Sequence, residues 1–408
     1  MSQVASAGVV REKPRVNRWL VLALGLAAQT ASCTFLYGLP FLVPAMRATA
    51  GLTLAQAGTV VAAPSAGLLL TLIVWGAAAD RYGERLIMAL GLGASGLLLV
   101  FAALGTHSVG LLFGVFLAAG ACSASVNAAS GRVVMGWFSA SERGVAMGIR
   151  QTAQPLGVGV AALGLPPLAE HWGFRAAMLL PAVLAVVVAA LVVWLVVDPP
   201  RPVGPGAGPG AGSGEKPPSP YRKPALWRLH GASALLVVPQ FAVSAFAPVY
   251  LVSVQHWGVL AAGWFLAVVQ VLGALGRLAS GYWSDRVGSR LRPMRQLAVA
   301  SAAAMLLVAL GDATWPWLAA LALALAAVIT VSDNGLGFTA SAELAGVAWS
   351  GRAMGAQNTA QNLASALTPP VLGLVIGDSR YALAFCVAAI FPALAITLVP
   401  TRAEHLGS

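Results

Sequence analysis

The stretch Gly76-Ala-Ala-Ala-Asp80-Arg81-Tyr-Gly83-Glu-Arg85 returns 205 residues later as Gly281-Tyr-Trp-Ser-Asp285-Arg286-Val-Gly288-Ser-Arg290. A second pair keeps nearly the same offset, because AMGIRQTAQ at 146–154 returns as AMGAQNTAQ at 353–361. Both copies of the Asp-Arg stretch lie at the end of a long apolar run. A chain built from two similar apolar halves most often moves a solute across a bilayer, with its site between the halves.

The composition indicates a membrane-embedded chain. Hydrophobic residues make up 59% of the sequence and charged residues only 9%, whereas a soluble domain carries about 25% charge. The net charge of +11 does not indicate nucleic-acid binding, because the charges lie in short connectors between apolar runs. The three cysteines lie inside apolar runs, where we expect small buried side chains and no disulfide or metal pair.

Apolar runs long enough to cross a bilayer number six, then six again after a break. We therefore predict an all-α membrane protein with 12 transmembrane helices in two six-helix bundles. The expected domains are 1–197 and 229–408, joined by a Pro- and Gly-rich linker at 198–228. The predicted spans are 19–44, 54–79, 86–105, 111–137, 144–167, 173–197, 229–254, 258–283, 294–311, 315–340, 352–377 and 381–400.

The distribution of Lys and Arg predicts the orientation of these spans. If both termini are cytoplasmic, 18 of the 24 basic residues fall in cytoplasmic segments and three in the opposite loops. This asymmetry predicts an N-in, C-in protein of the bacterial inner (plasma) membrane.

Twelve spans in a 6+6 arrangement, with Gly-x-x-x-Asp-Arg-x-Gly-x-Arg after spans 2 and 8, resemble the major facilitator superfamily. The resemblance covers nearly the whole chain. It implies secondary transport without a cofactor, and loops on the cytoplasmic side that latch the two halves when the transporter is closed inside.

Elementary electrostatics gives the same expectation for these loops. Asp80 and Asp285 lie where their helices leave the membrane, so each can face the positive N-terminus of a helix in the other half, near Gly351 and Gly144 respectively. The alternative is a basic loop that only fixes the topology. The predicted gate also includes the motif glycines, of which Gly83 and Gly288 permit tight turns, and four basic donors; these residues are Gly76, Gly281, Gly83, Gly288, Arg81, Arg85, Arg286 and Arg290.

Charges inside the spans are functional candidates, because burying a charge in a bilayer is costly. Arg150, Arg277 and Arg132 lie within spans, against one carboxylate, Asp333. A cationic interior favours an anionic solute, since arginine matches a carboxylate or a phosphate. Asp333 is the candidate proton carrier; the alternative is a fixed partner for one of the arginines.

Arg277 precedes Gly281 by one turn, and this spacing resembles the substrate-binding arginine of monocarboxylate and oxalate-type carriers. The chain departs from both types. Gly273 stands where monocarboxylate carriers have an aspartate, and span 11 offers amides where the oxalate type has a lysine. The alternative for Arg277 is snorkelling to the headgroups.

Amide side chains recur at matching positions of the two halves. We predict that they line the cavity with the two arginines, as helical spacing places Arg150 and Gln154 on one face; the alternative is packing between helices. The predicted substrate-binding residues are Arg277, Arg150, Gln154, Asn127, Gln29, Gln240, Gln357, Gln361 and Asn334.

These features predict a secondary active carrier for a small, carboxylate-type organic anion, coupled to protons or to solute exchange. The alternative is proton-driven efflux of drugs or amphipathic metabolites, although the Gly-Pro-x-x-Gly-Gly ending typical of span 5 in such exporters is incomplete. A membrane receptor is a third class, which predicts no flux. An enzyme is not expected, since the five histidines show no ligand spacing. We expect a monomer whose partners are solute and lipid, with no nucleic acid and no metal.

Overall fold

The computed structural model describes residues 17–51, 53–105, 108–199, 219–377 and 379–406. The first half of the chain forms one helical bundle. Its helices are α1 (Arg18–Leu36), the short helices η1 (Leu39–Leu42) and α2 (Val43–Ala50), α3 (Leu54–Tyr82), α4 (Glu84–Leu104), α5 (Val109–Trp137), α6 (Arg143–Gln151), α7 (Ala153–Ala177) and α8 (Leu179–Leu195).

The second half forms a matching bundle. Its helices are η2 (Pro220–Arg222), α9 (Pro224–Val249), η3 (Tyr250–Val254), α10 (Val259–Val287), α11 (Leu291–Ala313), α12 (Pro316–Ser332), α13 (Asn334–Ala345), α14 (Ser350–Ile376), α15 (Tyr381–Leu398) and η4 (Thr401–Leu406). Within the predicted linker at 198–228, α9 already begins at Pro224, and residues 200–218 lie outside the described residues.

Local sequence signals set where these helices begin. Asn17 caps α1 by accepting the backbone N–H of Trp19 at 3.0 Å. Thr53 and Gln56 form a capping box at the start of α3. Gly83 has a φ of +96°, a conformation open to glycine, and it separates α3 from α4 with a single residue.

Within the described residues, twelve long helical segments match the twelve predicted spans. Nine described segments are long and apolar enough to cross a membrane. The pair 143–177 and 179–195 passes the same test jointly, with a 66° bend between its members, and α14 is the twelfth long segment. Two predicted spans are interrupted, because α6 and α7 meet at Thr152 while α12 and α13 meet at Asp333.

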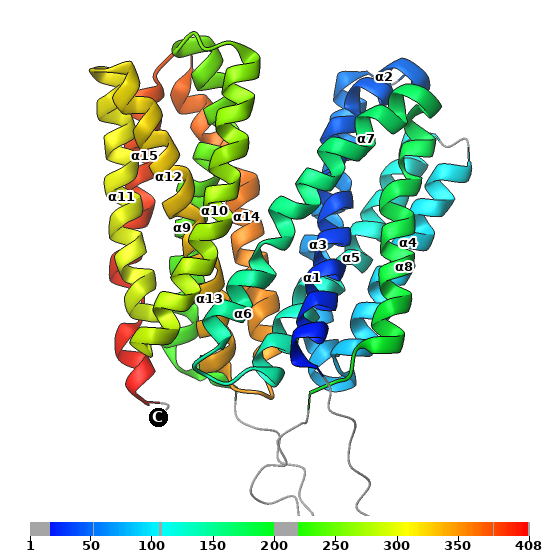
Figure 1. The fold of residues 1–408 in the computed structure, drawn as a ribbon, viewed down its shortest axis with the longest axis horizontal. Helices are drawn as coiled ribbons and strands as arrows, with labels where there is room; N and C mark the ends of the chain where they lie inside the picture. The colour runs from blue at the N-terminus through cyan, green and yellow to red at the C-terminus, as the bar shows by residue number, and fades with distance from the viewer. Residues whose placement is uncertain (1–16, 52, 106–107, 200–218, 378, 407–408) are drawn as a thin grey trace, which may run out of the picture.

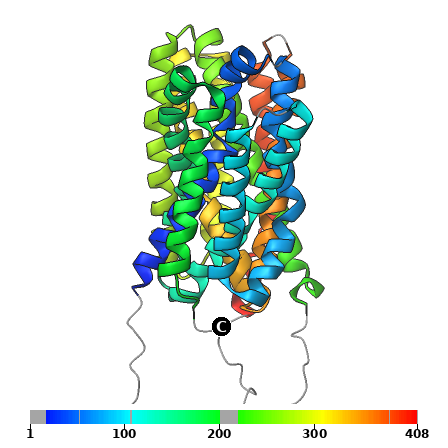
Figure 2. The same ribbon diagram turned by 90° about the vertical axis from the view of Figure 1, so that its right-hand side faces the viewer.

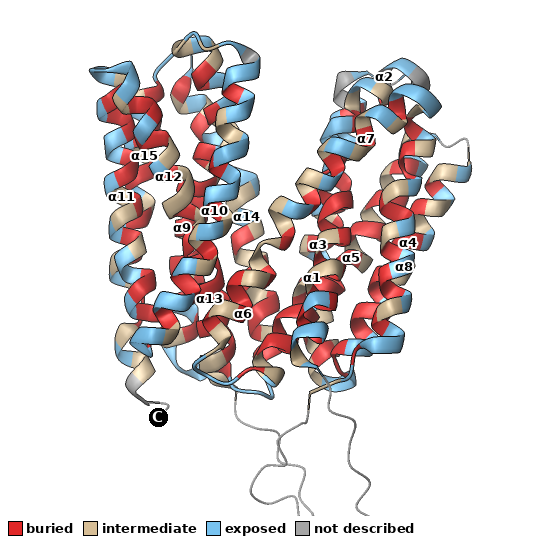
Figure 3. Cartoon of the chain, viewed as in Figure 1, coloured by how far each residue is buried: buried red, intermediate tan, exposed pale blue. Residues whose placement is uncertain are grey.

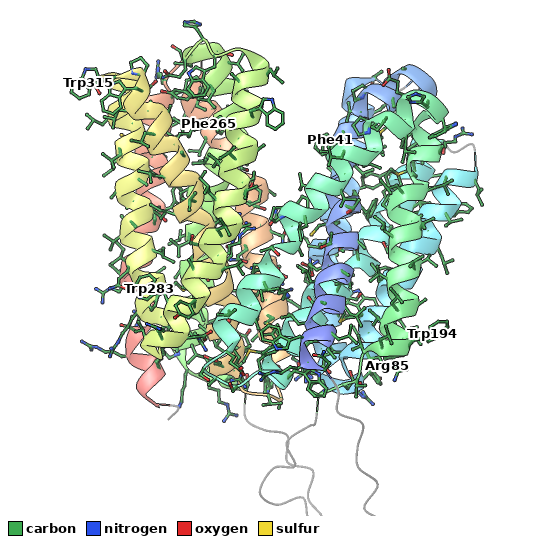
Figure 4. The ribbon with its side chains drawn as sticks, in the orientation of Figure 1. Phe41, Arg85, Trp194, Phe265, Trp283 and Trp315 are labelled. Carbon is green, nitrogen blue, oxygen red and sulfur yellow. The ribbon has the colours of Figure 1, made fainter. Side chains whose placement is uncertain are left out.

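The surface of the bundles suits a bilayer. Figure 3 shows buried residues facing the inside of each bundle and exposed residues facing outward, and the exposed side chains of the spans include many Leu and Val. Trp194, Trp283 and Arg85 lie toward one end of the molecule, and Phe41, Phe265 and Trp315 toward the other (Figure 4). Aromatic side chains at both ends are typical of membrane interfaces.

The two bundles lie side by side and diverge. In Figure 1 they meet at the end where the C-terminus lies and stand apart at the opposite end, and Figure 2 shows the helices running roughly along one common direction. We call the end where they meet the seam face; it carries the loops at 82–84 and 287–290. Contacts between the bundles join α3 and α5 to α14, α6 to α10 and α13, and α5 to α13.

Each bundle has its own apolar core, and a smaller cluster joins them. Phe35, Phe116 and Leu165 are buried in the first bundle, and Tyr250 and Phe385 in the second. The shared cluster includes residues from both halves, listed here: Leu22, Val134, Phe138, Ala146, Met147, Phe338, Ala342 and Met354. Apolar burial therefore stabilises the bundles separately and also holds them together at the seam face.

Candidate functional site

The first contact between the halves is formed by Asp80 at the end of α3. Its carboxylate accepts the backbone N–H groups of Gly351, at 2.8 Å, and Arg352, at 3.1 Å. These N–H groups belong to the first turn of α14, where the helix dipole favours a negative charge. Arg132 of α5 donates to the same carboxylate at 2.6 Å. We call this contact the first seam.

The second seam repeats this geometry with the halves exchanged. Asp285, at the end of α10, accepts the backbone N–H groups of Gly144, at 2.9 Å, and Val145, at 2.8 Å, in the first turn of α6. Arg290 donates to Asp285 at 2.5 Å and also donates to the carbonyl of Ala140 in the other half. Both predicted acid-to-helix contacts are therefore present.

Glycines allow the backbones to touch at both seams. A Cβ atom on Gly76 would collide with the carbonyl oxygen of Gly351, and one on Gly351 would collide with that of Gly76. Gly281 and Gly144 show the same reciprocal exclusion. Only glycine fits at these four positions without a shift of the helices.

A second row of glycines extends each seam by one helical turn. A Cβ atom on Gly148 of α6 would lie 2.7 Å from the carbonyl oxygen of Arg277 in α10. A Cβ atom on Gly355 of α14 would lie 2.7 Å from the carbonyl oxygen of Leu72 in α3. The halves are thus packed backbone to backbone over two turns on each side.

The basic residues of the predicted gate do not all lie where we expected. Arg81 lies over the ring of Tyr82 and Arg286 over that of Tyr282. Arg85 donates from its backbone to Asp198, at 2.8 Å, and from its side chain to Val193 in α8. The described ion pairs of Asp80 are instead with Arg132 and Arg352.

Acids just beyond the last span of each half were missed in the sequence. Asp198 accepts the backbone N–H of Arg85 at the start of α4. Glu404 accepts the backbone N–H of Leu291, at 2.8 Å, at the start of α11. The positions 198 and 404 differ by nearly the repeat offset, which is the signal that would have paired them.

Residues of both bundles line a cavity of about 80 Å³ above the seams, which we call the central cavity. Seven of the nine predicted substrate-binding residues line it, while Arg277 and Gln357 do not. The lining residues are Gln29, Cys33, Tyr37, Leu68, Asn127, Arg150, Gln151, Ala153, Gln154, Val237, Gln240, Phe241, Asn334, Phe338, Asn358, Gln361, Asn362 and Ser365.

Arg150 is held in this cavity by neutral groups. Its Nε donates to Ser130 at 2.9 Å, one Nη donates to the carbonyl of Asn127 at 2.8 Å, and the other to the side chain of Gln151 at 3.0 Å. Its guanidinium also lies over the ring of Phe338. Only 3% of the residue is exposed, and among the described residues no carboxylate lies within 4.0 Å of it.

The amides that match between the halves are hydrogen-bonded within each half. Gln29 donates to the side-chain oxygen of Asn127 at 2.9 Å. The corresponding residues, Gln240 and Asn334, are joined at 3.2 Å, with Asn334 donating. Both pairs line the cavity, so the repeat supplies one amide pair on each wall.

Three amides of the cavity still hold unused donors. The side-chain N–H₂ groups of Asn127, Asn358 and Gln361 are buried and donate to no described acceptor. Unpaired buried donors are costly, since they lose their hydration without compensation. They lie on both walls, because Asn127 belongs to α5 and the other two belong to α14.

Arg277 lies in the seam rather than in the cavity lining. Its Nη1 donates to the backbone carbonyl of Gln151 in the other half at 3.0 Å, and its Nε has no described partner. Pro155 has no N–H with which to bond the carbonyl four residues before it, so the carbonyl of Gln151 is available. The departure from the predicted lining position therefore follows from a proline in span 5.

Asp333 is buried at the break between α12 and α13, and its Oδ2 has no described partner. The charges of Asp333 and Arg277 act on one another, although no ion pair within 4.0 Å joins them in the described chain. Asp333 does not line the central cavity.

Gln357 occupies the position of Arg150 in the second half, but it points to a different network. Its side-chain oxygen lies 2.5 Å from Nδ1 of His230, and Nε2 of His230 lies 3.0 Å from the hydroxyl of Tyr221. Burial raises the pKa of the Tyr221 hydroxyl, in η2, to about 12. This network connects the inside of the second bundle to its seam face.

A larger cavity of about 740 Å³ opens at the seam face. Its arginines are already engaged with carboxylates. Arg132 pairs with Asp80 and Glu84 at 2.6 and 2.8 Å, and Arg290 pairs with Asp285. Arg143, the third arginine of this lining, pairs with Glu343 at 3.5 Å, so each arginine here has a carboxylate partner, unlike Arg150. In the described chain no three His, Cys, Asp or Glu side chains are grouped to hold a metal ion.

Comparison with known proteins gives a consistent picture. A family model described as the Major Facilitator Superfamily matches residues 22–369. An uncharacterized MFS-type transporter of Mycobacterium tuberculosis (strain ATCC 25618 / H37Rv) is 43% identical over 387 residues, which cover 94% of this chain and 85% of the relative. The probable galactarate/D-glucarate transporter of Bacillus subtilis (strain 168) is 24% identical over 332 residues, which cover 73% of this chain and 72% of the relative.

Among solved structures, the human organic anion transporter MFSD10 superposes with a TM-score of 0.72 at 18% identity. The superposition covers 95% of this chain and 100% of that one. At this identity the likeness establishes the fold.

Proposed function

Because this chain belongs to the Major Facilitator Superfamily and is a secondary transporter, we propose that its cargo is a small organic anion of carboxylate type. One observation carries the proposal: the buried guanidinium of Arg150 lines a cavity between the halves without a carboxylate partner. A buried charge without a counter-ion is strongly unfavourable. An anionic solute that enters the cavity supplies the missing charge.

The Bacillus subtilis relative, named as a probable transporter of galactarate and D-glucarate, supports an anionic cargo. The family and fold are those of transporters and not of enzymes. We further propose that the protein is a monomer of the inner membrane.

The transport cycle follows from the seams. We propose that the seam face is cytoplasmic, with both termini on that side, in line with the excess of Lys and Arg there. The halves are closed at this face and apart at the other (Figure 1), so the structure corresponds to an outward-facing state. Rocking of residues 1–197 against 229–408 then separates Asp80 from Gly351 and Asp285 from Gly144, and opens the cavity to the cytoplasm.

We assign the coupling role to a proton carried by Asp333. Its Oδ2 has no described partner, and no arginine lies within 4.0 Å of it among the described residues. Arg277, on which its charge acts, spans the seam through the carbonyl of Gln151. A change in the protonation of Asp333 therefore reaches a contact that must break when the halves move.

Uptake into proteoliposomes tests the proposed cargo. The purified protein is reconstituted with a pH gradient and offered labelled organic acids, and Arg150→Gln is compared with Arg380→Gln, an exposed loop arginine. We expect Arg150→Gln to abolish saturable anion uptake while Arg380→Gln retains it. Equal uptake by both variants would contradict the role of Arg150.

Export of drugs is the competing function, and the same variants separate it from anion transport. A cell that expresses the protein would gain resistance to amphipathic drugs, and that resistance would persist in Arg150→Gln. Such a result, together with no anion uptake, would replace the proposal with drug efflux.

A further inference from the structure

The central cavity contains one cation and no carboxylate among its lining residues. The second buried arginine near it, Arg277, lies outside the lining and donates to the backbone carbonyl of Gln151. The cavity therefore offers one compensating positive charge. A solute with a single negative charge leaves the occupied cavity neutral, whereas a second negative charge would face only neutral amides.

The Arg150 guanidinium has N–H groups to spare for a carboxylate. A guanidinium has five N–H groups, and three of those of Arg150 are used, by Ser130, the carbonyl of Asn127 and Gln151. About two therefore remain, one on each Nη atom. Two parallel N–H donors match the two oxygens of a carboxylate. Arg150 is thus equipped to hold a carboxylate at the wall formed by the first bundle.

The wall opposite Arg150, formed by α14, presents neutral hydrogen-bond donors and suits a neutral acceptor group. Asn358 and Gln361 of α14 present buried N–H₂ groups that donate to no described acceptor, and Asn127 presents a third on the wall of Arg150. These donors need oxygen acceptors, but no cation accompanies them. Hydroxyl oxygens satisfy such donors without adding charge.

We propose that the substrate is a polyhydroxylated monocarboxylate, a sugar acid of the aldonate or uronate kind, with its carboxylate on Arg150 and its hydroxyls on Asn358 and Gln361. This assignment rests on the proposed function and narrows it from organic anions to one class. The carboxylate and the hydroxyl chain bridge the two halves, so the occupied cavity joins the walls that the transport cycle must bring together.

The assignment predicts that other solutes bind less tightly than a sugar acid. Dicarboxylates and phosphate monoesters place a second charge in a site with one cation, and they bind less well. Aliphatic monocarboxylates leave the amide donors unpaired, and a site built to bond hydroxyls rejects an analogue that lacks them. Neutral sugars leave Arg150 without a counter-ion.

Thermal stabilisation of the purified protein by five probes tests this ranking, because a ligand of the native state raises its Tm. The probes are gluconate, glucarate, glucose 6-phosphate, hexanoate and glucose. We expect gluconate to bind at least tenfold more tightly than each of the other four. Tighter binding of glucarate, glucose 6-phosphate or hexanoate would overturn the assignment while leaving the anion proposal intact.

Variants then locate the two ends of the solute. Asn358→Leu and Gln361→Leu should weaken the binding of gluconate at least tenfold and leave the binding of hexanoate unchanged. Arg150→Gln should weaken the binding of both acids. A loss of gluconate binding confined to Arg150→Gln would contradict the hydroxyl contacts. If none of the acids stabilises the protein and amphipathic drugs do, the proposed function itself fails.

Discussion

The carboxylate of Asp80 accepts the backbone N–H of Gly351 at 2.8 Å across 271 residues of sequence. Asp285 and Gly144 form the same contact in the opposite sense, at 2.9 Å. Each acid sits at the positive end of a helix of the other half. The seam face is therefore closed by two equivalent electrostatic contacts, related by the internal repeat.

Removing these charges should open the seam face. An N-terminal acid contributes about 1 to 2 kcal/mol to such a contact, so Asp80→Asn or Asp285→Asn should shift the equilibrium between closed and open states roughly 5- to 30-fold. Spin-label distances across the seam face measure this shift. Unchanged distance distributions in both variants would show that other contacts close the face.

Enlarging the seam glycines should have a steric effect instead. Gly351→Val and Gly144→Val place side chains where the backbones of Gly76 and Gly281 now lie, so the closed state should be lost and transport with it. Gly159→Val in α7 is the matched control, because no atom lies within 4 Å of a Cβ at that position. Equal transport activity in the three variants would refute the backbone contact.

Arg132 should matter for folding stability. It bridges Asp80 and Glu84 at 2.6 and 2.8 Å in a buried position. Arg132→Leu leaves Glu84 without its cation and Asp80 with only the longer pair to Arg352, at 3.8 Å, and breaking such a buried pair costs about 3 to 5 kcal/mol. We expect a Tm lower by several degrees in detergent, while Arg380→Gln stays close to wild type. A Tm equal to that of wild type would mean that the acids find other partners.

The pH dependence of Arg18 and Glu142 can be given a sign. A hydrogen bond from the Ser139 hydroxyl lowers the pKa of Glu142 below its ordinary value of 4.5, and a hydrogen bond from Arg18 lowers it further. The contact therefore stabilises the folded protein above pH 4.5 and is lost as the pH falls through the lowered pKa. A small Tm difference between wild type and Glu142→Gln should be seen at neutral pH and disappear in acid. A difference that grows in acid would contradict this sign.

Asp333→Asn tests the coupling ion. If the carboxyl carries the proton, the variant should lose accumulation driven by a pH gradient but keep exchange of labelled for unlabelled solute across the membrane. Reconstituted vesicles permit both measurements on one preparation. Retention of proton-driven accumulation would leave Asp333 as a structural partner of Arg277.

The sequence predicted the seams well, because their determinants are local and duplicated. An acid at a helix end, a glycine one turn before it and a matching partner in the other half are all readable from spacing. The seam contacts of Asp80 and Asp285 were expected for this reason. The capping acids Asp198 and Glu404 follow the same repeat, but each stands in a polar tail where no motif marks it.

The positions of individual arginines were harder to predict. Spacing along span 8 suggested that Arg277 faces the cavity, but the carbonyl of Gln151, available because of Pro155, holds it in the seam. Arg132 was counted only as an internal charge, since its two acids come from α3 and α4. Tertiary partners from different helices decide such positions, and one sequence does not reveal them.

The most direct measurement is the ratio of the Kd for glucose to the Kd for glucuronate in wild-type protein and in Arg150→Gln. Both probes are pyranose rings and differ chiefly in charge, so the ratio isolates what the guanidinium contributes. We predict a ratio above ten in wild type and close to one in the variant. An unchanged ratio in Arg150→Gln would contradict the claim that a lone buried arginine selects an anionic cargo.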